Sequence, residues 1–358
     1  MKKTKSKYLN IYDYENPNYP FQVFIGGRGC GKTYSALFGA VEKHQKEGKK
    51  FVFMRRTGQE LELLMDMQSK EGLNPFKPIN DALGTNIGIK QLRKDIGGIY
   101  QRSYGNVGTK DAGKLMYEEN YGYAVAVTTI KNIRGVDFSD CDFIIYDEFI
   151  PEKHVHKITG EGIALLNAYE TMNRNRELEG KPAMAMYLLA NSNDIYNEIF
   201  KELHLVNIAE RMLAKGESDK YFQDRGLAIH LINDNQEFRT EKAKTALYKL
   251  SKGTSFYDMS LNNEFAFNDF SLTGYRNLKG YQPICAFGEA YIYKHKGKDE
   301  MYVSYAPAKV EKYNPDHDYE KRMFLQKFME PLCKYYVAGA IMFESYELKS
   351  LILDAIIL

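Results

Sequence analysis

The sequence predicts an α/β fold with a mainly parallel sheet, followed by a smaller α+β unit. Two observations predict the sheet: short apolar runs that end in polar residues recur in the first two hundred residues, and segments with helical spacing separate them. A third observation predicts the second unit. Beyond residue 237, aromatic residues are interleaved with a local excess of basic ones. We expect three parts at 1–205, 206–236 and 237–358, the middle one being a linker or small connecting subdomain.

A glycine-rich stretch follows the first apolar run and fits the phosphate-loop (P-loop) pattern G-x-x-x-x-G-K-[ST] at every fixed position. The run at 21–25 is typical of a buried strand, and apolar residues at helical spacing follow, with Gly48 as the expected helix end. Glycines let backbone N–H groups surround a phosphate, and a helix N-terminus favours its charge. Lys32 is expected at the β- and γ-phosphates, and Thr33 at Mg²⁺. The predicted nucleotide site comprises Gly26, Gly27, Arg28, Gly29, Cys30, Gly31, Lys32 and Thr33.

A second signature is the apolar run 143–146 followed by Asp147 and Glu148. An Asp at the end of a buried strand holds the Mg²⁺ shell in this kind of site, and the Glu after it would orient and deprotonate the attacking water. Small-molecule kinases do not need such a Glu, so the pair favours hydrolysis of the nucleotide. A further expected strand, 185–190, ends at Asn191, which could sense the γ-phosphate or form an ordinary Asx turn.

Several cations are candidates for completing the site. Arg55 and Arg56 end an expected strand at 51–54, where they would face either the ligand crevice or solvent. In ring-shaped motors a cation from one subunit completes the site of its neighbour and can contribute roughly 10³–10⁵ in rate. Four residues are candidates for that role: Arg174 and Arg176 at the end of an expected helix at 162–176, and Lys131 and Arg134 in a basic loop.

Two further predictions concern the β-rich parts of the chain. Residues 85–128 read as hairpins inserted before the acidic strand, with Gly97-Gly98 as a tight turn. In the last part, 285–293 and 301–305 read as paired strands, and two helices are expected after residue 317. A nuclease that uses two metal ions needs a carboxylate cluster, which these strands do not supply, so we expect no such cleavage.

Composition limits the remaining possibilities. Lys and Arg number 49 against 47 Asp and Glu, so the net charge of +2 argues neither for nor against nucleic acid. The four cysteines are far apart, predict no disulfide framework and fit a reducing cytosol. No apolar run reaches the roughly 18 residues that a membrane span needs, and the basic start lacks the apolar core of a secretory signal.

With these motifs assembled, the chain resembles the DNA-encapsidation (packaging) ATPases of small tailed phages of the phi-twenty-nine type, which are relatives of large terminase subunits. The strings that carry the resemblance are Asp147-Glu148-Phe149-Ile150, Arg174-Asn175-Arg176-Glu177 and Leu189-Ala190-Asn191-Ser192, together with the P-loop and, less closely, Asp258-Met259-Ser260-Leu261-Asn262-Asn263.

The resemblance implies an ATPase of the additional-strand, catalytic-glutamate class, followed by a ribonuclease-H-like domain that has lost cleavage. It implies a ring, of five subunits in this family, that uses ATP and Mg²⁺ to move double-stranded DNA through the portal of a prohead in the host cytoplasm. It also implies Arg174 as the trans-acting arginine, with Lys131 or Arg134 as a second cation. Members of this family bind a structural RNA, which the sequence does not decide. Two other classes stay open: a terminase-type nuclease and a non-motor, nucleotide-switched binding protein.

Overall fold

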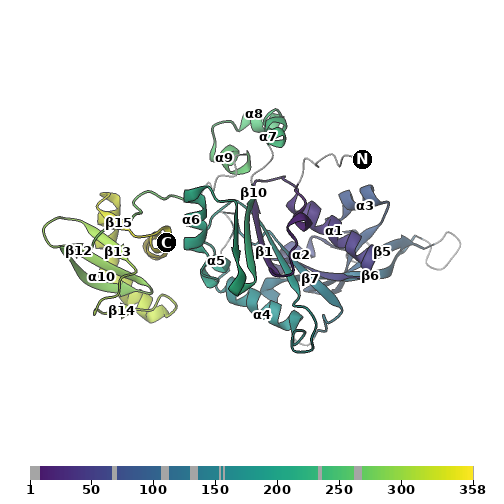
Figure 1. Ribbon diagram of the computed structural model, residues 1–358, viewed down its shortest axis with the longest axis horizontal. Coiled ribbons are helices and arrows are strands. Elements are labelled where there is room, and N and C mark those ends of the chain that lie inside the picture. Colours follow the sequence, from purple (N-terminus) through teal and green to yellow (C-terminus); the bar gives the residue numbers. More distant parts are fainter. Residues whose placement is uncertain are drawn as a thin grey trace. The chain divides into compact units, whose positions relative to one another are not determined.

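The structure, a computed structural model, describes residues 9–66, 71–105, 113–129, 136–152, 155, 158–232, 236–261 and 268–357. The chain divides into two compact units (Figure 1). Residues 1–203 and 215–266 form the first unit, and residues 204–214 and 267–358 form the second. None of the helices in the described ranges combines the length and apolar character that a bilayer crossing requires.

The first unit is built on a ten-stranded sheet with the order β3-β4-β5-β6-β2-β7-β8-β1-β10-β9. Along this order, neighbouring strands from β6 to β10 are parallel. At either end of this parallel part the sheet continues with an antiparallel strand, β5 next to β6 and β9 next to β10. Strand β8 lies between β1 and β7 and is the additional strand of the predicted class. The bounds are β1 Phe21–Gly26, β2 Lys50–Arg55, β3 Met65–Asp66, β4 Ile87–Arg93, β5 Ile96–Tyr104, β6 Leu115–Ala126, β7 Cys141–Asp147, β8 Ala185–Asn191, β9 Asp219–Phe222 and β10 Leu227–Ile232.

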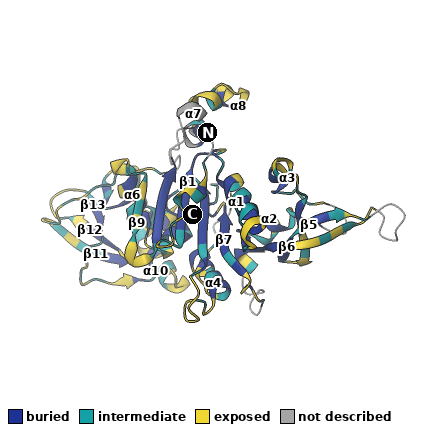
Figure 2. Ribbon diagram, turned by 45° about the vertical axis from the view of Figure 1, so that its right-hand side comes forward, coloured by how far each residue is buried: buried dark blue, intermediate teal, exposed yellow. Residues whose placement is uncertain are grey.

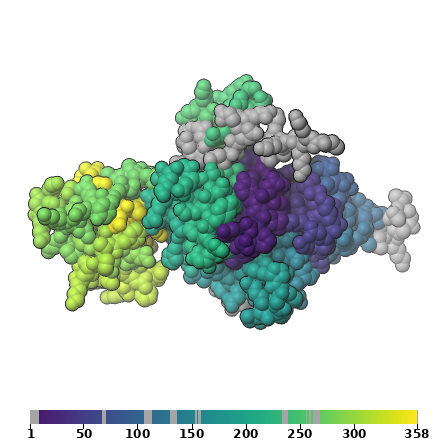
Figure 3. All heavy atoms as spheres, viewed as in Figure 1, coloured from purple at the N-terminus to yellow at the C-terminus, as the bar shows by residue number. Residues whose placement is uncertain are grey.

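Helices cover both faces of this sheet. Side chains alternate between the two faces along a strand, so in β7 Ile145 faces α1 (Lys32–Glu47), whereas Tyr146 reaches Glu161 of α4 (Glu161–Asn173). The 3-10 helix η1 (Ile11–Tyr14) packs on α1, where the Tyr12 hydroxyl donates to the Ala36 carbonyl at 2.8 Å. The two helices lie in the purple part of the surface in Figure 3. The other helices are α2 Gly58–Glu62, α3 Lys77–Leu83, α5 Glu198–Glu202, η3 Gln223–Arg225, α7 Gln236–Ala243, α8 Ala246–Leu250 and α9 Ser255–Leu261.

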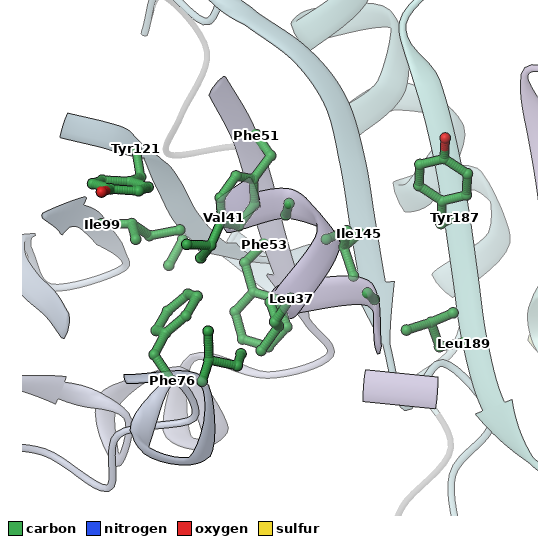
Figure 4. Packing of buried hydrophobic residues seen from close by; sticks show 14 of the residues in the cluster. Leu37, Val41, Phe51, Phe53, Phe76, Ile99, Tyr121, Ile145, Tyr187 and Leu189 are labelled. Atoms are coloured by element: carbon green, nitrogen blue, oxygen red, sulfur yellow. The ribbon is translucent and has the colours of Figure 1, made fainter. Parts of the chain in front are cut away.

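The core under α1 fixes the position of the P-loop. Leu37 and Val41 of α1 lie among Phe51 and Phe53 of β2 and Ile145 of β7 (Figure 4), and all five side chains are buried. Burying side chains of this size stabilises the fold by about 1.5–3 kcal/mol each. Figure 2 shows the same pattern across the sheet: the central strands are buried, whereas residues 115–120 of β6 are intermediate or exposed. The loop between β1 and α1 is therefore held on both sides by packed elements.

The structure differs from the expected linker at 206–236. Residues 219–222 and 227–232 form β9 and β10, and β10 is a buried strand paired in parallel with β1. The sequence pattern missed this strand because the buried His230 interrupts its apolar run, its imidazole being held by Asp219 of β9 at 2.6 Å. Helix α6 (Val206–Lys215) belongs largely to the second unit.

The predicted tight turn at Gly97-Gly98 is wrong, because both glycines lie inside β5. A Cβ at Gly97 would come within 2.4 Å of the Ile89 side chain, and one at Gly98 within 2.4 Å of the Tyr100 ring. These glycines therefore mark close packing rather than a change of direction. The turn lies just before them, at 94–95.

The second unit is α+β, with a five-stranded sheet in the order β14-β11-β12-β13-β15. The stretch expected as a single strand at 285–293 is a hairpin, because the chain turns at Gly288-Glu289 with Gly288 at φ 58°. The pairing of β12 with β13 and the two C-terminal helices are as expected. The bounds are β11 Tyr281–Phe287, β12 Ala290–His295, β13 Met301–Ser304, β14 Lys312–Tyr313, α10 Asp318–Val337, β15 Ile341–Phe343 and α11 Tyr346–Ile356. The ribonuclease-H-like origin of this unit stays a prediction.

A buried lysine of the last helix of this unit binds residues 269 and 271. The ammonium of Lys349, whose side chain is 2% exposed, donates to the Asp269 carboxylate at 2.7 Å and to the Ser271 carbonyl at 2.7 Å. The hydrogen bond from Lys349, followed by hydrogen bonds from Ser271, lowers the pKa of Asp269 to about 2. The ionised carboxylate is therefore favoured in the folded state.

We expect Asp269→Asn to lower the urea midpoint of unfolding at pH 5. Because the folded pKa is depressed, the carboxylate's contribution is present above the ordinary Asp pKa of about 3.9 and is lost as the pH falls through about 2. The difference between the parental chain and the variant should therefore shrink between pH 4 and pH 2. A difference that is constant over this range would contradict the assignment.

Candidate functional site

The parallel sheet brings the predicted residues to one edge. In register, Gly26 of β1 lies opposite Asn191 of β8, and Leu189 of β8 lies opposite Asp147 of β7. The carboxyl ends of these strands therefore meet where α1 begins. Residues from the P-loop, from the end of β7 and from the end of β8 line a cleft of about 800 Å³: Arg28, Gly29, Gly31, Lys32, Thr33, Tyr34, Asp147, Glu148, Ala190 and Asn191.

The P-loop takes its shape from its glycines. Gly29 and Gly31 have φ angles of 75° and 98°, a left-handed backbone that residues with a Cβ rarely adopt. Helix α1 starts directly afterwards at Lys32, so its first N–H groups face the loop. The arrangement is that of a phosphate cradle at a helix N-terminus.

Lys32 is buried under this loop. Its ammonium donates to the carbonyls of Gly26 and Gly27, both at 2.9 Å, and to the side-chain oxygen of Asn191 at 3.2 Å. Asn191 therefore contacts the lysine that is expected to bind phosphate. The sensing role of Asn191 stays a prediction.

Thr33 and Asp147 provide oxygen atoms for a cation. The Thr33 hydroxyl donates to the Asp147 carboxylate at 2.9 Å, so the two groups already lie together. Burial raises the pKa of Asp147, while Arg55 and Thr33 act in the opposite direction. Mg²⁺ prefers hard oxygen ligands and is commonly bound by one or two side chains plus substrate phosphates. This pair fits that demand. The described residues contain no group of three or more His, Cys, Asp or Glu that could hold a metal by themselves.

Glu148 follows Asp147 in a strained backbone conformation. Its φ of 56° lies in the left-handed region, which costs a non-glycine residue free energy and is frequent at functional sites. The side chain is 54% exposed and lines the cleft. The turn at Glu148 thus points its carboxylate out of the sheet edge beside the P-loop.

Arg55 lies between the two acids. Its guanidinium donates to Asp147 at 3.1 Å and to Glu148 at 2.5 Å, and its side chain is only 15% exposed. The neighbouring Arg56 turns away and forms a buried bidentate pair with Glu161 at 2.9 and 3.0 Å. From the sequence, both arginines could face either the crevice or solvent. In the structure Arg55 binds the two acids that line the crevice, and Arg56 is buried. The pairing of Arg55 with Glu148 had no sequence signal of its own.

The candidate trans-acting residues fall in different surroundings. Helix α4 ends at Asn173, and Arg174 follows with φ 48° and a side chain that is 48% exposed, near Asp137 at 3.6 Å. Arg176 instead packs against the start of β7, where it donates to the Cys141 carbonyl. Arg174 is not among the residues that line the chain's own cleft. Lys131 and Arg134 lie outside the described residues.

Together these features define the class of protein. A P-loop strand and an acidic strand lie on either side of one additional strand, and Lys32, Thr33, Asp147 and Glu148 meet at their ends. This is the fold of a P-loop nucleoside-triphosphatase of the additional-strand class.

Comparison with known families identifies the chain more closely. The profile described as "Podovirus DNA encapsidation protein (Gp16)" matches residues 100–324, more than half of the chain. The chain belongs to the Podovirus DNA encapsidation protein (Gp16) family. The matched region includes Asp147, Glu148 and Arg174 but begins after the P-loop, so the P-loop is an independent observation.

Individual relatives agree with this family. The "DNA packaging protein" of Bacillus phage PZA and that of Bacillus phage phi29 are each 27% identical over 242 residues, which is 67% of this chain and 60% of the relative. The match therefore spans less than two thirds of these relatives' length.

Among solved structures, "The bacteriophage Phi-29 viral genome packaging motor assembly" aligns with a TM-score of 0.63 and 21% identity over 98% of both chains. "The Phi-28 gp11 DNA packaging Motor" aligns with a TM-score of 0.57 and 17% identity over 95% of both. These structures support the fold.

Proposed function

We propose that this chain hydrolyses ATP with Mg²⁺ and uses the free energy to move double-stranded DNA into a prohead. One observation carries the proposal: the cleft beside the P-loop unites a phosphate-binding lysine, an oxygen pair that suits Mg²⁺ and a strained, accessible glutamate. The names of the relatives, which are DNA packaging proteins, supply the substrate class.

Each residue has a proposed task. Lys32 would exchange the carbonyls of Gly26 and Gly27 for the β- and γ-phosphates, which are stronger, charged acceptors. Thr33 and Asp147 would hold Mg²⁺, which when bound neutralises charge on the phosphates. Glu148 would orient a water molecule and take its proton. Asn191, in contact with Lys32, would report the loss of phosphate to β8.

Arg55 would keep this site inactive until nucleotide and DNA are in place. The Glu148 carboxylate accepts a hydrogen bond from the Arg55 guanidinium at 2.5 Å, which occupies an oxygen that would otherwise contact water and holds the side chain beside Arg55. Glu148 must therefore leave Arg55 before it can accept a proton from water. The exposed position of Glu148, compared with the buried Asp147, leaves it room to move.

The assembly is proposed to be a ring, of five subunits by the resemblance, docked at the portal of the prohead. Arg174, exposed and outside its own cleft, would complete the site of the neighbouring subunit. Lys131 and Arg134 remain candidates for a second cation in that role. Double-stranded DNA is the proposed cargo, and a structural RNA is a possible further partner in this family. The second unit is proposed as a nucleic-acid-binding domain without nuclease activity, which is what the resemblance to the packaging ATPases implies.

The test is the rate of ATP hydrolysis with and without double-stranded DNA, measured together with mass by light scattering. We expect turnover that DNA stimulates and that Lys32→Ala abolishes, with a mass several times 41.3 kDa. Saturable ATP binding without turnover would favour a nucleotide-switched binding protein, and nicking of a plasmid with Mn²⁺ would favour a terminase-type nuclease. Stimulated turnover by a chain that stays monomeric would contradict the ring.

A further inference from the structure

The helices that follow β10 lie beside the P-loop. Because β10 is parallel to β1, with Ile232 opposite Gly26, the chain leaves β10 at the edge of the sheet where the P-loop begins. Helices α7, α8 and α9 come next, and the chain then continues into the second unit (Figure 1). Topology alone therefore brings this helical segment, residues 236–261, to the nucleotide cleft.

Lys242 of α7 makes the principal contact. Its ammonium donates to the backbone carbonyl of Arg28 in the P-loop and, at 2.9 Å, to that of Ser260 in α9. It also lies 5.0 Å from the centre of the Tyr248 ring of α8. One side chain thus joins all three helices of the segment to the P-loop. A second contact supports the first, since the Arg28 guanidinium lies 5.9 Å from the centre of the Phe256 ring.

The geometry of the peptide bond gives this contact a consequence for phosphate. In a planar trans peptide the C=O and the following N–H point in opposite directions. Lys242 binds the carbonyl of the Arg28–Gly29 peptide, so the N–H of Gly29 points away from Lys242. Arg28 and Gly29 line the cleft, whereas Lys242 does not. The N–H is therefore directed to the cleft side, where a P-loop donor binds phosphate.

We propose that Lys242 is a positioning residue for the nucleotide: it fixes the Arg28–Gly29 peptide with its N–H toward the phosphates. This inference rests on the proposed nucleotide binding and adds a residue outside the P-loop to it. The peptide needs such support because Gly29, at φ 75°, has no side chain to restrict its rotation. A cation on the carbonyl also polarises the peptide and strengthens the N–H as a donor.

The same contact couples the helical segment to the nucleotide. If docking of residues 236–261 raises the affinity for phosphate, then bound nucleotide stabilises the docked segment by the same factor. The segment directly precedes the second unit in the chain. Nucleotide occupancy would thereby change the stability of the connection between the two units.

The first test compares Lys242→Met with Lys244→Met. Lys244 lies on the same segment but pairs with Glu241 at 2.7 Å and has a 64% exposed side chain, which makes it a matched control. We expect Lys242→Met to weaken binding of a fluorescent ATP analogue with Mg²⁺ about tenfold, the effect of one charge-assisted hydrogen bond. Lys244→Met should bind the analogue with an affinity within twofold of that of the parental chain. Lys242→Arg, which keeps the positive charge, should retain most of the parental affinity. Parental affinity in Lys242→Met would overturn the proposal.

The second test is decided by the parental chain, so it remains available if Lys242→Met does not fold. Amide hydrogen exchange of α8 and α9 is followed in the full chain with and without a non-hydrolysable ATP analogue and Mg²⁺. We expect slower exchange with the analogue in the parental chain and in Lys244→Met, and no change in Lys242→Met. Unchanged exchange in a parental chain that binds the analogue would refute this coupling and leave the proposed function intact. A parental chain that does not bind the analogue at all would instead refute the proposed function.

Discussion

Replacing Glu148 by glutamine is expected to leave ATP binding intact and to slow hydrolysis by at least about 100-fold, the usual contribution of a general base. Glutamine has the same shape and can still donate to and accept from water, but it cannot take a proton at neutral pH. The strained backbone at φ 56° is unchanged by this substitution, so the cleft should keep its form. The measurements are single-turnover hydrolysis and equilibrium binding of ATP.

A control for this variant is Glu60→Gln. Glu60 also lies beside Arg55, with its carboxylate 3.5 Å from the guanidinium Nε, but it does not line the cleft. We expect its hydrolysis rate to stay within about threefold of the parental rate. A Glu148→Gln chain that hydrolyses ATP at the parental rate would remove Glu148 from the mechanism. Equal losses in both variants would indicate that the disturbance of Arg55, rather than the missing base, is responsible.

Sequence patterns predicted the parts of the site that depend on local order. The P-loop and the strands on which Asp147 and Asn191 lie have short apolar runs and fixed spacings, and parallel pairing then brings their ends together. The resemblance also implied the additional strand, which is β8. The family resemblance is confirmed by the profile match, while the roles of the individual site residues stay predictions.

Features that depend on tertiary pairing were not predictable in the same way. Arg55 and Arg56 are adjacent and chemically identical, yet one binds the acids of the cleft and the other a buried glutamate. Only the alternation of a strand's two faces, combined with the partners on each, separates them. Strand β10 was missed because a buried histidine interrupts its apolar run, and the contact of Lys242 with the P-loop joins residues 214 positions apart. No window of sequence contains both partners of such a contact.

A buried cluster connects the cleft with the helix that ends before Arg174. Glu161, the first residue of α4, accepts both hydrogen bonds from Arg56 and a third from the Tyr146 hydroxyl at 2.6 Å. Arg56 directly follows Arg55, which holds Glu148. Because a buried, fully paired carboxylate is costly to separate from its partners, the start of α4 is firmly attached to the ends of β2 and β7. A movement of Arg55 would therefore also displace the start of α4.

Arg174→Ala and Lys32→Ala are each expected to abolish ATP hydrolysis in a uniform ring, and a mixture of the two variants is expected to regain part of it. The expected loss for Arg174→Ala is about 10³-fold or more, as for other arginines that act on a transferring phosphate. In a mixed ring, the intact P-loop of an Arg174→Ala subunit can meet the intact Arg174 of a Lys32→Ala neighbour. Such pairs restore a complete site only if the arginine acts between subunits.

The measurement is the hydrolysis rate as the two inactive variants are mixed in different ratios, with a maximum expected near equal amounts. Lys181→Ala is the control, because Lys181 lies in the same connection after α4 with a 55% exposed side chain paired to Glu179 at 3.0 Å. Mixed with Lys32→Ala, it should give activity in simple proportion to its own share. If every mixture of Arg174→Ala with Lys32→Ala stays inactive, Arg174 acts within its own subunit or only supports the fold, since a residue that completes a neighbour's site must complement a neighbour that lacks the lysine.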